Sequence, residues 1–120
     1  MIIRALAADP QLAFNAWLDP FIMHRWMQSV PDHEIVAIEL RPRSGGDFTI
    51  IERAGEREVR VCGRFDAVER SHHLALTLAD ASGVSLDIVP CERGCEMRLV
   101  TRGRPDRWSA RIDRLATLLG

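Results

Sequence analysis

The spacing of hydrophobic residues changes twice along the chain, from helical to alternating and back to helical. Near the N-terminus, Asp9-Pro10 and Asp19-Pro20 each provide a capping carboxylate followed by a proline that fits the first position of a helix. Apolar residues at helical spacing follow these signals: Phe14, Trp17 and Leu18, then Ile22, Met23, Trp26 and Met27. The pattern predicts two short helices after a first strand over Ile2–Leu6.

Between residues 32 and 102 the inward positions alternate with polar ones, as in strands that bury one face. A strand over residues 35–38 is followed by five more, whose inward positions are Phe48, Ile50, Val59, Val61, Gly63, Phe65, Leu74, Leu76, Leu78, Val84, Leu86, Ile88, Cys95, Met97, Leu99 and Thr101. Short turns separate these strands, for example Ala54–Glu56 and Ala81–Gly83. Strands joined in this way form an antiparallel meander.

The last segment is predicted to be a long helix that lies on the apolar face of the sheet. Pro105 and Asp106 suit its first turn. One apolar stripe runs along it, made of Trp108, Ile112, Leu115 and Leu119. The opposite, exposed face is assigned to Arg107, Arg111, Asp113 and Arg114. A helix with one apolar stripe needs a surface to cover, and the sheet provides it.

Composition limits the classes of protein that the chain can belong to. A length of 120 residues predicts one domain over residues 1–120. The net charge of -1 gives no long-range attraction to nucleic acid or anionic membranes. No apolar run approaches the roughly 20 residues of a membrane span, and no signal peptide is recognised. With three cysteines and no CxxC motif, reduced thiols and a cytoplasmic protein are expected.

Four short motifs in a fixed order carry a resemblance to a known family. They are Phe14-x-Ala16-Trp17-x-Asp19-Pro20 with Trp26-Met27, then Arg43-Ser44-Gly45-Gly46-Asp47-Phe48, then Gly63-Arg64-Phe65-Asp66-Ala67-Val68 with His73–Thr77, and finally Trp108 with Leu115. In these the chain resembles the activator of heat-shock-protein ATPase homologue-like family, within the START and birch-allergen superfamily (SRPBCC). The resemblance implies an α+β helix-grip fold, in which a curved antiparallel sheet of six or seven strands wraps around the C-terminal helix.

The resemblance also implies a hydrophobic cavity between the sheet and the last helix. A strongly bent sheet cannot touch a straight helix along its whole length, so space remains unless large side chains fill it. The candidate lining residues for a ligand are Trp26, Phe48, Ile50, Val61, Phe65, Leu76, Leu86, Met97, Trp108, Ile112 and Leu115. The alternative is that these side chains pack into a dry core, because protein interiors normally close to high density.

The residues capable of catalysis or metal binding are few and dispersed. His24 with Asp19 could act as a general base near the pocket mouth, although a surface histidine is the simpler interpretation. His33 stands alone in a loop, and consecutive strand positions would point His72 and His73 apart. No metal-ligand spacing is recognisable, and no cofactor is expected.

The cysteines give two readings. Cys91 and Cys95 flank a turn and could approach disulfide distance there. The preferred interpretation is that both thiols are reduced and that Cys95 faces the core. Cys62 is expected to face away from the pocket and has no base within reach in the sequence.

These observations favour a non-catalytic carrier or sensor of a small apolar molecule, of lipid or polyketide type. Two alternatives remain open. One is a co-chaperone-type interaction protein that activates a heat-shock ATPase. The other is an enzyme of the cyclase or dehydratase kind that uses His24 with Asp19 or Arg43. A homodimer or a chaperone partner is possible under these hypotheses, whereas nucleic acid and a membrane span are not expected.

Overall fold

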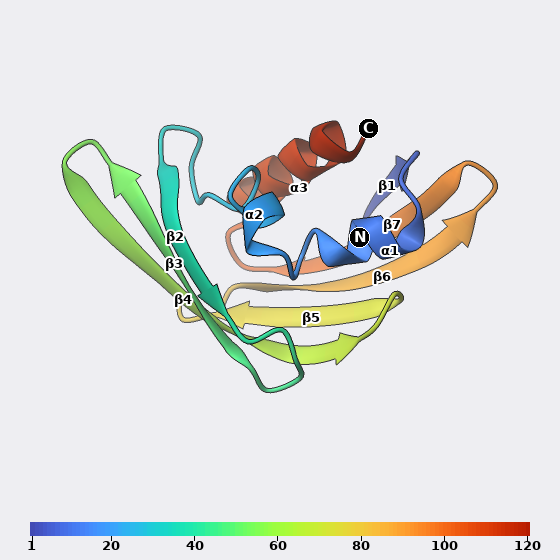
Figure 1. Cartoon of the computed structure of the whole chain (residues 1–120), viewed down its shortest axis with the longest axis horizontal. Helices are drawn as coiled ribbons and strands as arrows, with labels where there is room; N and C mark the ends of the chain where they lie inside the picture. Colours follow the sequence, from blue (N-terminus) through green and yellow to red (C-terminus); the bar gives the residue numbers. More distant parts are fainter.

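Seven strands form one curved antiparallel sheet, and three helices lie on its concave side (Figure 1). The computed structural model describes all 120 residues. In chain order the elements are β1 (Ile2–Leu6), α1 (Pro10–Asn15), α2 (Pro20–Met23), β2 (Glu34–Leu40), β3 (Asp47–Ala54), β4 (Arg57–Glu69), β5 (His73–Leu78), β6 (Gly83–Cys91), β7 (Gly94–Arg102) and α3 (Pro105–Leu119). The predicted order of a strand, two short helices, six strands and a long helix is confirmed.

The sheet is a meander from β2 to β7, and β1 pairs with β7 at the far edge. Its curvature is greatest along β4, which pairs with β3 through its first half and with β5 through its second half. A register shift between Phe65 and Ala67 marks a bulge where β4 bends. Gly63 precedes this bulge, and a Cβ there would collide with the ring of Phe48 on β3. The glycine therefore lets an aromatic side chain lie flat across the strand.

Both short helices begin where the sequence predicts. The carboxylate of Asp9 accepts a hydrogen bond from the Leu12 N–H at 2.9 Å, and that of Asp19 accepts one from the Phe21 N–H at 2.9 Å. The second helix, however, ends at Met23, earlier than the apolar spacing suggested. The chain then turns, and the Trp26 indole N–H donates to the carbonyl of Ala16 at 3.1 Å.

One continuous core lies between the concave face of the sheet and the helices. It contains 26 buried hydrophobic residues, which come from every helix and strand and also from the connections that follow α1 and α2. The rings of Trp17 and Trp26 pack edge to face with their centres 4.6 Å apart, and the ring centres of Phe48 and Phe65 are 5.1 Å apart. In α3, Trp108, Ile112 and Leu115 are fully buried, as the stripe predicts, and Leu119 is partly buried.

The assignment of Arg111 to the exposed face of α3 is wrong. Arg111 is 2% exposed and belongs to the buried side of the helix. The reason is geometric: it lies three residues after Trp108 and four before Leu115, and both spacings place side chains on the same helix face. Arg107 and Arg114 are half-buried, and of the four assigned residues only Asp113 is exposed.

Candidate functional site

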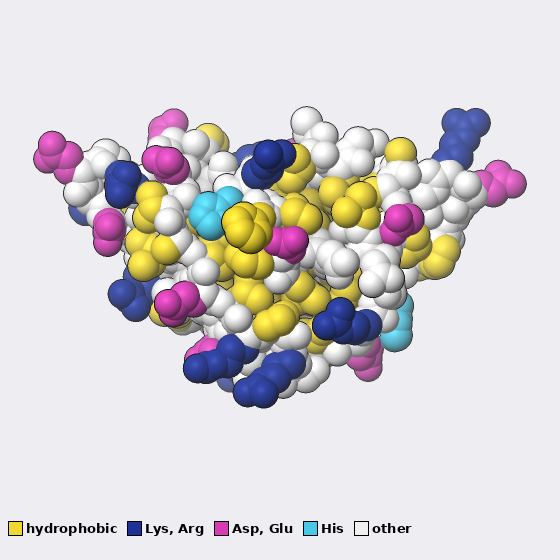
Figure 2. Space-filling model, viewed as in Figure 1, with side chains coloured by type: hydrophobic (Ala, Val, Ile, Leu, Met, Phe, Trp, Pro, Cys, Tyr) yellow, Lys and Arg dark blue, Asp and Glu magenta, His cyan; other side chains and the backbone are white.

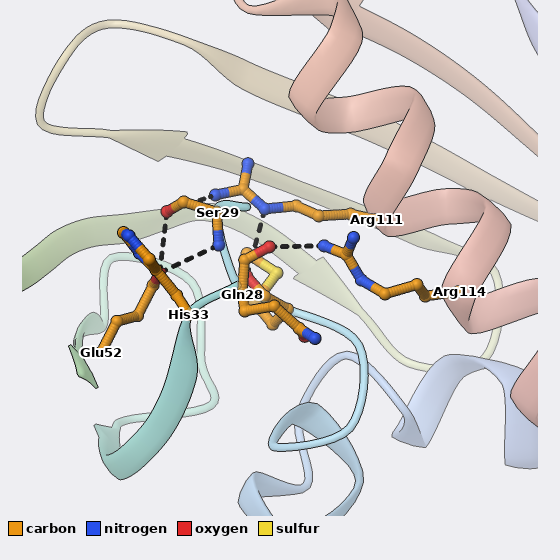
Figure 3. Close-up of polar contacts among 7 residues, drawn as sticks. Gln28, Ser29, His33, Glu52, Arg111 and Arg114 are labelled. Atoms are coloured by element: carbon orange, nitrogen blue, oxygen red, sulfur yellow. Dashed lines mark hydrogen bonds and ion pairs between the residues drawn. The ribbon is translucent and has the colours of Figure 1, made fainter. Parts of the chain in front are cut away.

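A buried carboxylate on β3 is the centre of a polar cluster at one end of the core. Glu52 is 0% exposed because it follows Phe48 and Ile50 on the inward face of the strand. Its carboxylate accepts hydrogen bonds from the Ser29 N–H at 3.1 Å and from the Ser29 hydroxyl at 2.7 Å. His33 Nδ1 lies 2.8 Å from Oε1 (Figure 3). The three partners satisfy a charge that would otherwise be costly to bury.

Arg111 joins this cluster from the opposite side (Figure 3). Its Nε donates to the carbonyl of Met27 at 3.1 Å, and its Nη2 donates to the hydroxyl oxygen of Ser29 at 3.3 Å. Its guanidinium also lies over the Trp108 ring, 4.6 Å from the ring centre. Burial lowers the pKa of Arg111 to about 10, and the nearby Glu52 carboxylate opposes that shift. The side chain therefore remains a cation at neutral pH. The Ser29 hydroxyl links it to Glu52, because it accepts a hydrogen bond from Arg111 and donates one to the carboxylate.

Arg114 attaches the same loop to the helix one turn later. Its Nε donates to the carbonyl of Trp26 at 3.2 Å, and its Nη2 donates to the carbonyl of Gln28. Burial lowers its pKa, and Glu52 again opposes the shift. Two arginines of α3 thus bind backbone carbonyls of residues 26–28, which would otherwise lack partners after the early end of α2.

A cavity of about 280 Å³ adjoins this cluster, between β4, the β5–β6 turn and the beginning of α3. The residues that line it are Ser29, His33, Val59, Arg60, Val61, Cys62, Leu78, Ala79, Asp80, Ser82, Arg104, Arg107 and Arg111. Val59 and Val61 of β4, with Leu78 and Ala79, form its apolar part, whereas Arg104, Arg107 and Arg111 at the beginning of α3 and Asp80 form its charged part. This combination is suited to holding an organic molecule with one polar end.

Asp80 and Arg104 form the ion pair at this cavity. The Asp80 carboxylate accepts hydrogen bonds from the hydroxyl and the backbone N–H of Ser82, and from Arg104 Nε at 3.3 Å. The Ser82 bonds, above all, hold the pKa of Asp80 below its ordinary value, against the effect of burial. Arg104 adopts a left-handed backbone conformation with φ of 47° and ψ of 50°, which is uncommon for a residue other than glycine.

The structure brings the eleven predicted lining residues together, but ten of them pack in the closed core and do not line a cavity. All except Val61 are at most 2% exposed and belong to the single hydrophobic cluster. Val61 is the one that lines the cavity. The cavity thus lies between sheet and last helix, as the resemblance implied, but toward the first turns of α3 and with a largely different set of residues.

The residues considered for catalysis are not assembled. His24 Nδ1 lies 2.7 Å from the carbonyl of Pro20, while the Asp19 carboxylate caps α2. Arg43 is exposed in the turn before β3. His73 pairs with Asp87 at 2.9 Å on the sheet, and His72 bonds a carbonyl in the adjoining turn. No group of three or more potential metal ligands occurs.

The cysteines behave as the preferred reading expected. Cys91 is exposed, Cys95 is fully buried, and all three cysteines are free. Burial, above all, raises the pKa of the Cys95 thiol, and the neighbouring Cys91 and Asp9 add to this effect. Cys62 borders the cavity, but its Sγ lies 4.0 Å from the Thr49 hydroxyl, on the face of the sheet opposite Phe48 and Ile50. Its thiol therefore points away from the core, as expected.

Sequence reasoning missed the buried positions of Glu52 and Arg111, the part played by Ser29 and the role of His33, although the chain carried a signal for Glu52 and Arg111. Glu52 is two positions after Ile50, so the alternation already placed a carboxylate on the buried face. Arg111 shares the spacing of the apolar stripe, as described above. Two opposite charges on the buried faces of β3 and α3 require polar partners, so the spacing already indicated a polar cluster between these two elements. Nothing in the sequence pattern indicated Ser29.

The curved sheet, the long helix on its concave face and the cavity between them define a helix-grip, START-like domain. The family model for "Activator of Hsp90 ATPase homolog 1-like protein" matches residues 7–117. The chain therefore belongs to this family, and the resemblance noted in the sequence is confirmed. A comparison with curated proteins gives no match.

Solved structures share the fold at low sequence identity. An AHSA1-like protein from Aeromonas hydrophila is 18% identical, with a TM-score of 0.85 over 97% of this chain and 88% of that chain. A protein from Nitrosomonas europaea is 18% identical, with a TM-score of 0.83 over 98% and 91% of the two chains. A Staphylococcus aureus protein described as of unknown function is 15% identical, with a TM-score of 0.71 over 98% and 82%. At such identities the likeness establishes the fold alone.

Proposed function

We propose that the protein is a non-catalytic binding protein for a small organic molecule with an apolar body. The observation that carries this proposal is the cavity of about 280 Å³ beside a core that is otherwise closed. Ligand pockets commonly measure roughly 300–1,000 Å³, so this one lies just below that range and would suit a small ligand. None of the helices is long and apolar enough to cross a membrane.

The apolar wall supports a ligand that is at least partly hydrophobic. Val59 and Val61 on β4 line the cavity together with Leu78 and Ala79 at the end of β5. Covering these side chains with an apolar ligand removes their surface from water, at roughly 25 cal/mol for each Å². The cyclase-type alternative lacks comparable support, because His24, Asp19 and Arg43 share no hydrogen bond or ion pair.

The proposal is tested on protein purified from cells without a denaturing step. Native mass spectrometry should show an added mass that disappears after unfolding and refolding. A solvatochromic dye should then bind the emptied protein saturably and be displaced by the extracted molecule. If no added mass is found and no dye in a broad set binds saturably, the proposal is wrong.

An interaction protein of co-chaperone type is a second candidate, favoured by one feature of the surface. Hydrophobic side chains gather at the middle of the face that α1 and α2 occupy (Figure 2). Within these helices Phe21 is 84% exposed and Leu12 is 45% exposed. A pulldown with the cognate heat-shock ATPase, using wild type and Phe21→Ser, tests this candidate. Equal recovery of the two, or recovery of neither, counts against it.

A further inference from the structure

One guanidinium nitrogen at the cavity has no partner. Arg111 Nη1 is buried and makes no hydrogen bond, although Nε and Nη2 of the same group are both used. In Figure 3 this nitrogen points away from Ser29, toward the N-terminal end of α3. Arg111 also lines the cavity. Buried polar atoms are nearly always satisfied in native proteins, so an unsatisfied cationic donor at a cavity calls for an acceptor.

Other unpaired donors in the protein do not share this position. The indole N–H groups of Trp17 and Trp108 are also buried without partners, but neither tryptophan lines the cavity. The Glu52 carboxylate is already engaged by Ser29 and His33. Gln28 Oε1 is a buried acceptor without a partner, but the Gln28 side chain points away from Arg111 in Figure 3 and does not line the cavity. The acceptor must therefore come from outside the protein.

The remaining charges around the cavity favour an anion. Asp80 is the only acid in the lining, and Arg104 together with Ser82 already satisfies it. Arg107 lines the cavity as well and forms no ion pair with any carboxylate. Together with Arg111, two cations of the lining have no acid of their own in contact.

We propose that the cavity binds its ligand through an anionic oxygen headgroup, a carboxylate or a phosphate monoester, held by Arg111 Nη1 and by Arg107. The apolar body of the ligand lies against Val61 and its neighbours on β4. Hydrogen bonds between a guanidinium and an anionic oxygen are stronger than neutral ones, and they gain further where water is excluded. This inference rests on the proposed function and specifies the class of ligand.

Four amphiphiles with the same chain and different heads test the inference directly. Octanoate, octyl phosphate, octanol and octylamine are titrated calorimetrically into the protein below their micelle concentrations. At least one of the two anions should bind about tenfold or more tightly than octanol, since one ion-assisted contact is worth that factor. Octylamine should bind most weakly, because its cation meets Arg107 and Arg111.

Variants separate recognition from folding. Arg107→Gln removes a half-buried cation that has no partner, so the fold should persist while the preference for the anion falls several-fold and octanol affinity is unchanged. Arg111→Lys keeps the charge but loses the guanidinium geometry, and it should reduce the preference as well if it folds. Arg93→Gln, in the exposed β6–β7 turn, is the matched control and should change nothing.

The outcomes distinguish this inference from the proposed function. If all four amphiphiles bind equally, or octylamine binds most tightly, the anionic headgroup is wrong and a binding protein remains. If the anions are preferred but Arg107→Gln leaves the preference intact, the assignment of Arg107 is wrong. If none of the four binds and no dye binds, both the inference and the proposed function are wrong.

Discussion

Two ends of the same interior differ in what fills them. In the core, aromatic and aliphatic side chains such as Trp26 and Phe65 close completely, with exposures of 0%. At the first turns of α3, the same inward positions of strand and helix carry Glu52 and Arg111 instead. Charged groups require hydrogen bonds in fixed directions, so they cannot collapse onto neighbours as apolar side chains do. The cavity therefore lies beside the inward positions that carry charged residues, whereas the positions that follow the hydrophobic pattern form a closed core.

The most disruptive change should be one in the closed region. Phe65→Ala removes a fully buried ring and should lower the free energy of unfolding by about 3–5 kcal/mol. Val61→Ala, at the cavity wall, should cost less than about 1 kcal/mol, because its side chain is only partly packed. Urea unfolding of both variants measures the contrast. Similar losses for the two would mean that the cavity wall is packed as tightly as the core.

The polar cluster should come next in size. Glu52→Gln keeps the shape of the side chain but removes its charge, which leaves one of the donors of Ser29 or His33 without a proper acceptor. The expected loss is about 1–3 kcal/mol. Glu58→Gln, exposed on β4, is the control and should stay within about 0.5 kcal/mol. A Glu52→Gln variant as stable as the control would show that the cluster contributes nothing to folding.

These two regions also differ in how far the sequence could predict them. The meander and the grip of the last helix follow from alternation and from the stripe through Trp108, because apolar burial is set by position along each element. The polar cluster was not predicted, because charged residues were assigned to exposed faces on the basis of residue type alone. Position alone would have buried Arg111 and Glu52, since each continues an apolar face.

Other parts of the site could not have been predicted from spacing. The early end of α2 at Met23 places Ser29 between Glu52 and Arg111, and it depends on tertiary bonds from Arg111 and Arg114 to the loop carbonyls. The volume left beside Val61 depends on how side chains from β4, β5, α3 and the adjoining loops meet. Neither the end of α2 nor the volume of the cavity can be predicted from a local hydrophobic pattern.

A smaller, pH-dependent effect is expected at the cavity's ion pair. Because the pKa of Asp80 is below its ordinary value of 3.8 in the folded protein, its carboxylate stabilises folding fully above that pH. This contribution is lost as the pH falls through the lower, folded value. The difference in unfolding free energy between wild type and Asp80→Asn should therefore shrink as the pH is lowered from about 7 to about 2. A difference that stays constant over this range would contradict the role of the Ser82 and Arg104 bonds.

The most direct test of whether the region around Val61 is a ligand cavity is to fill it. Val61→Trp should leave the free energy of unfolding within about 1 kcal/mol of wild type, because the new ring occupies empty space, and it should abolish binding of the dye and of octanoate. Val84→Trp makes the same change in the closed core, where overpacking should cost about 1–3 kcal/mol. Urea unfolding and calorimetry on the two variants and the wild type measure both effects. The account is contradicted if Val61→Trp is destabilised as much as Val84→Trp, or if it binds both ligands as wild type does.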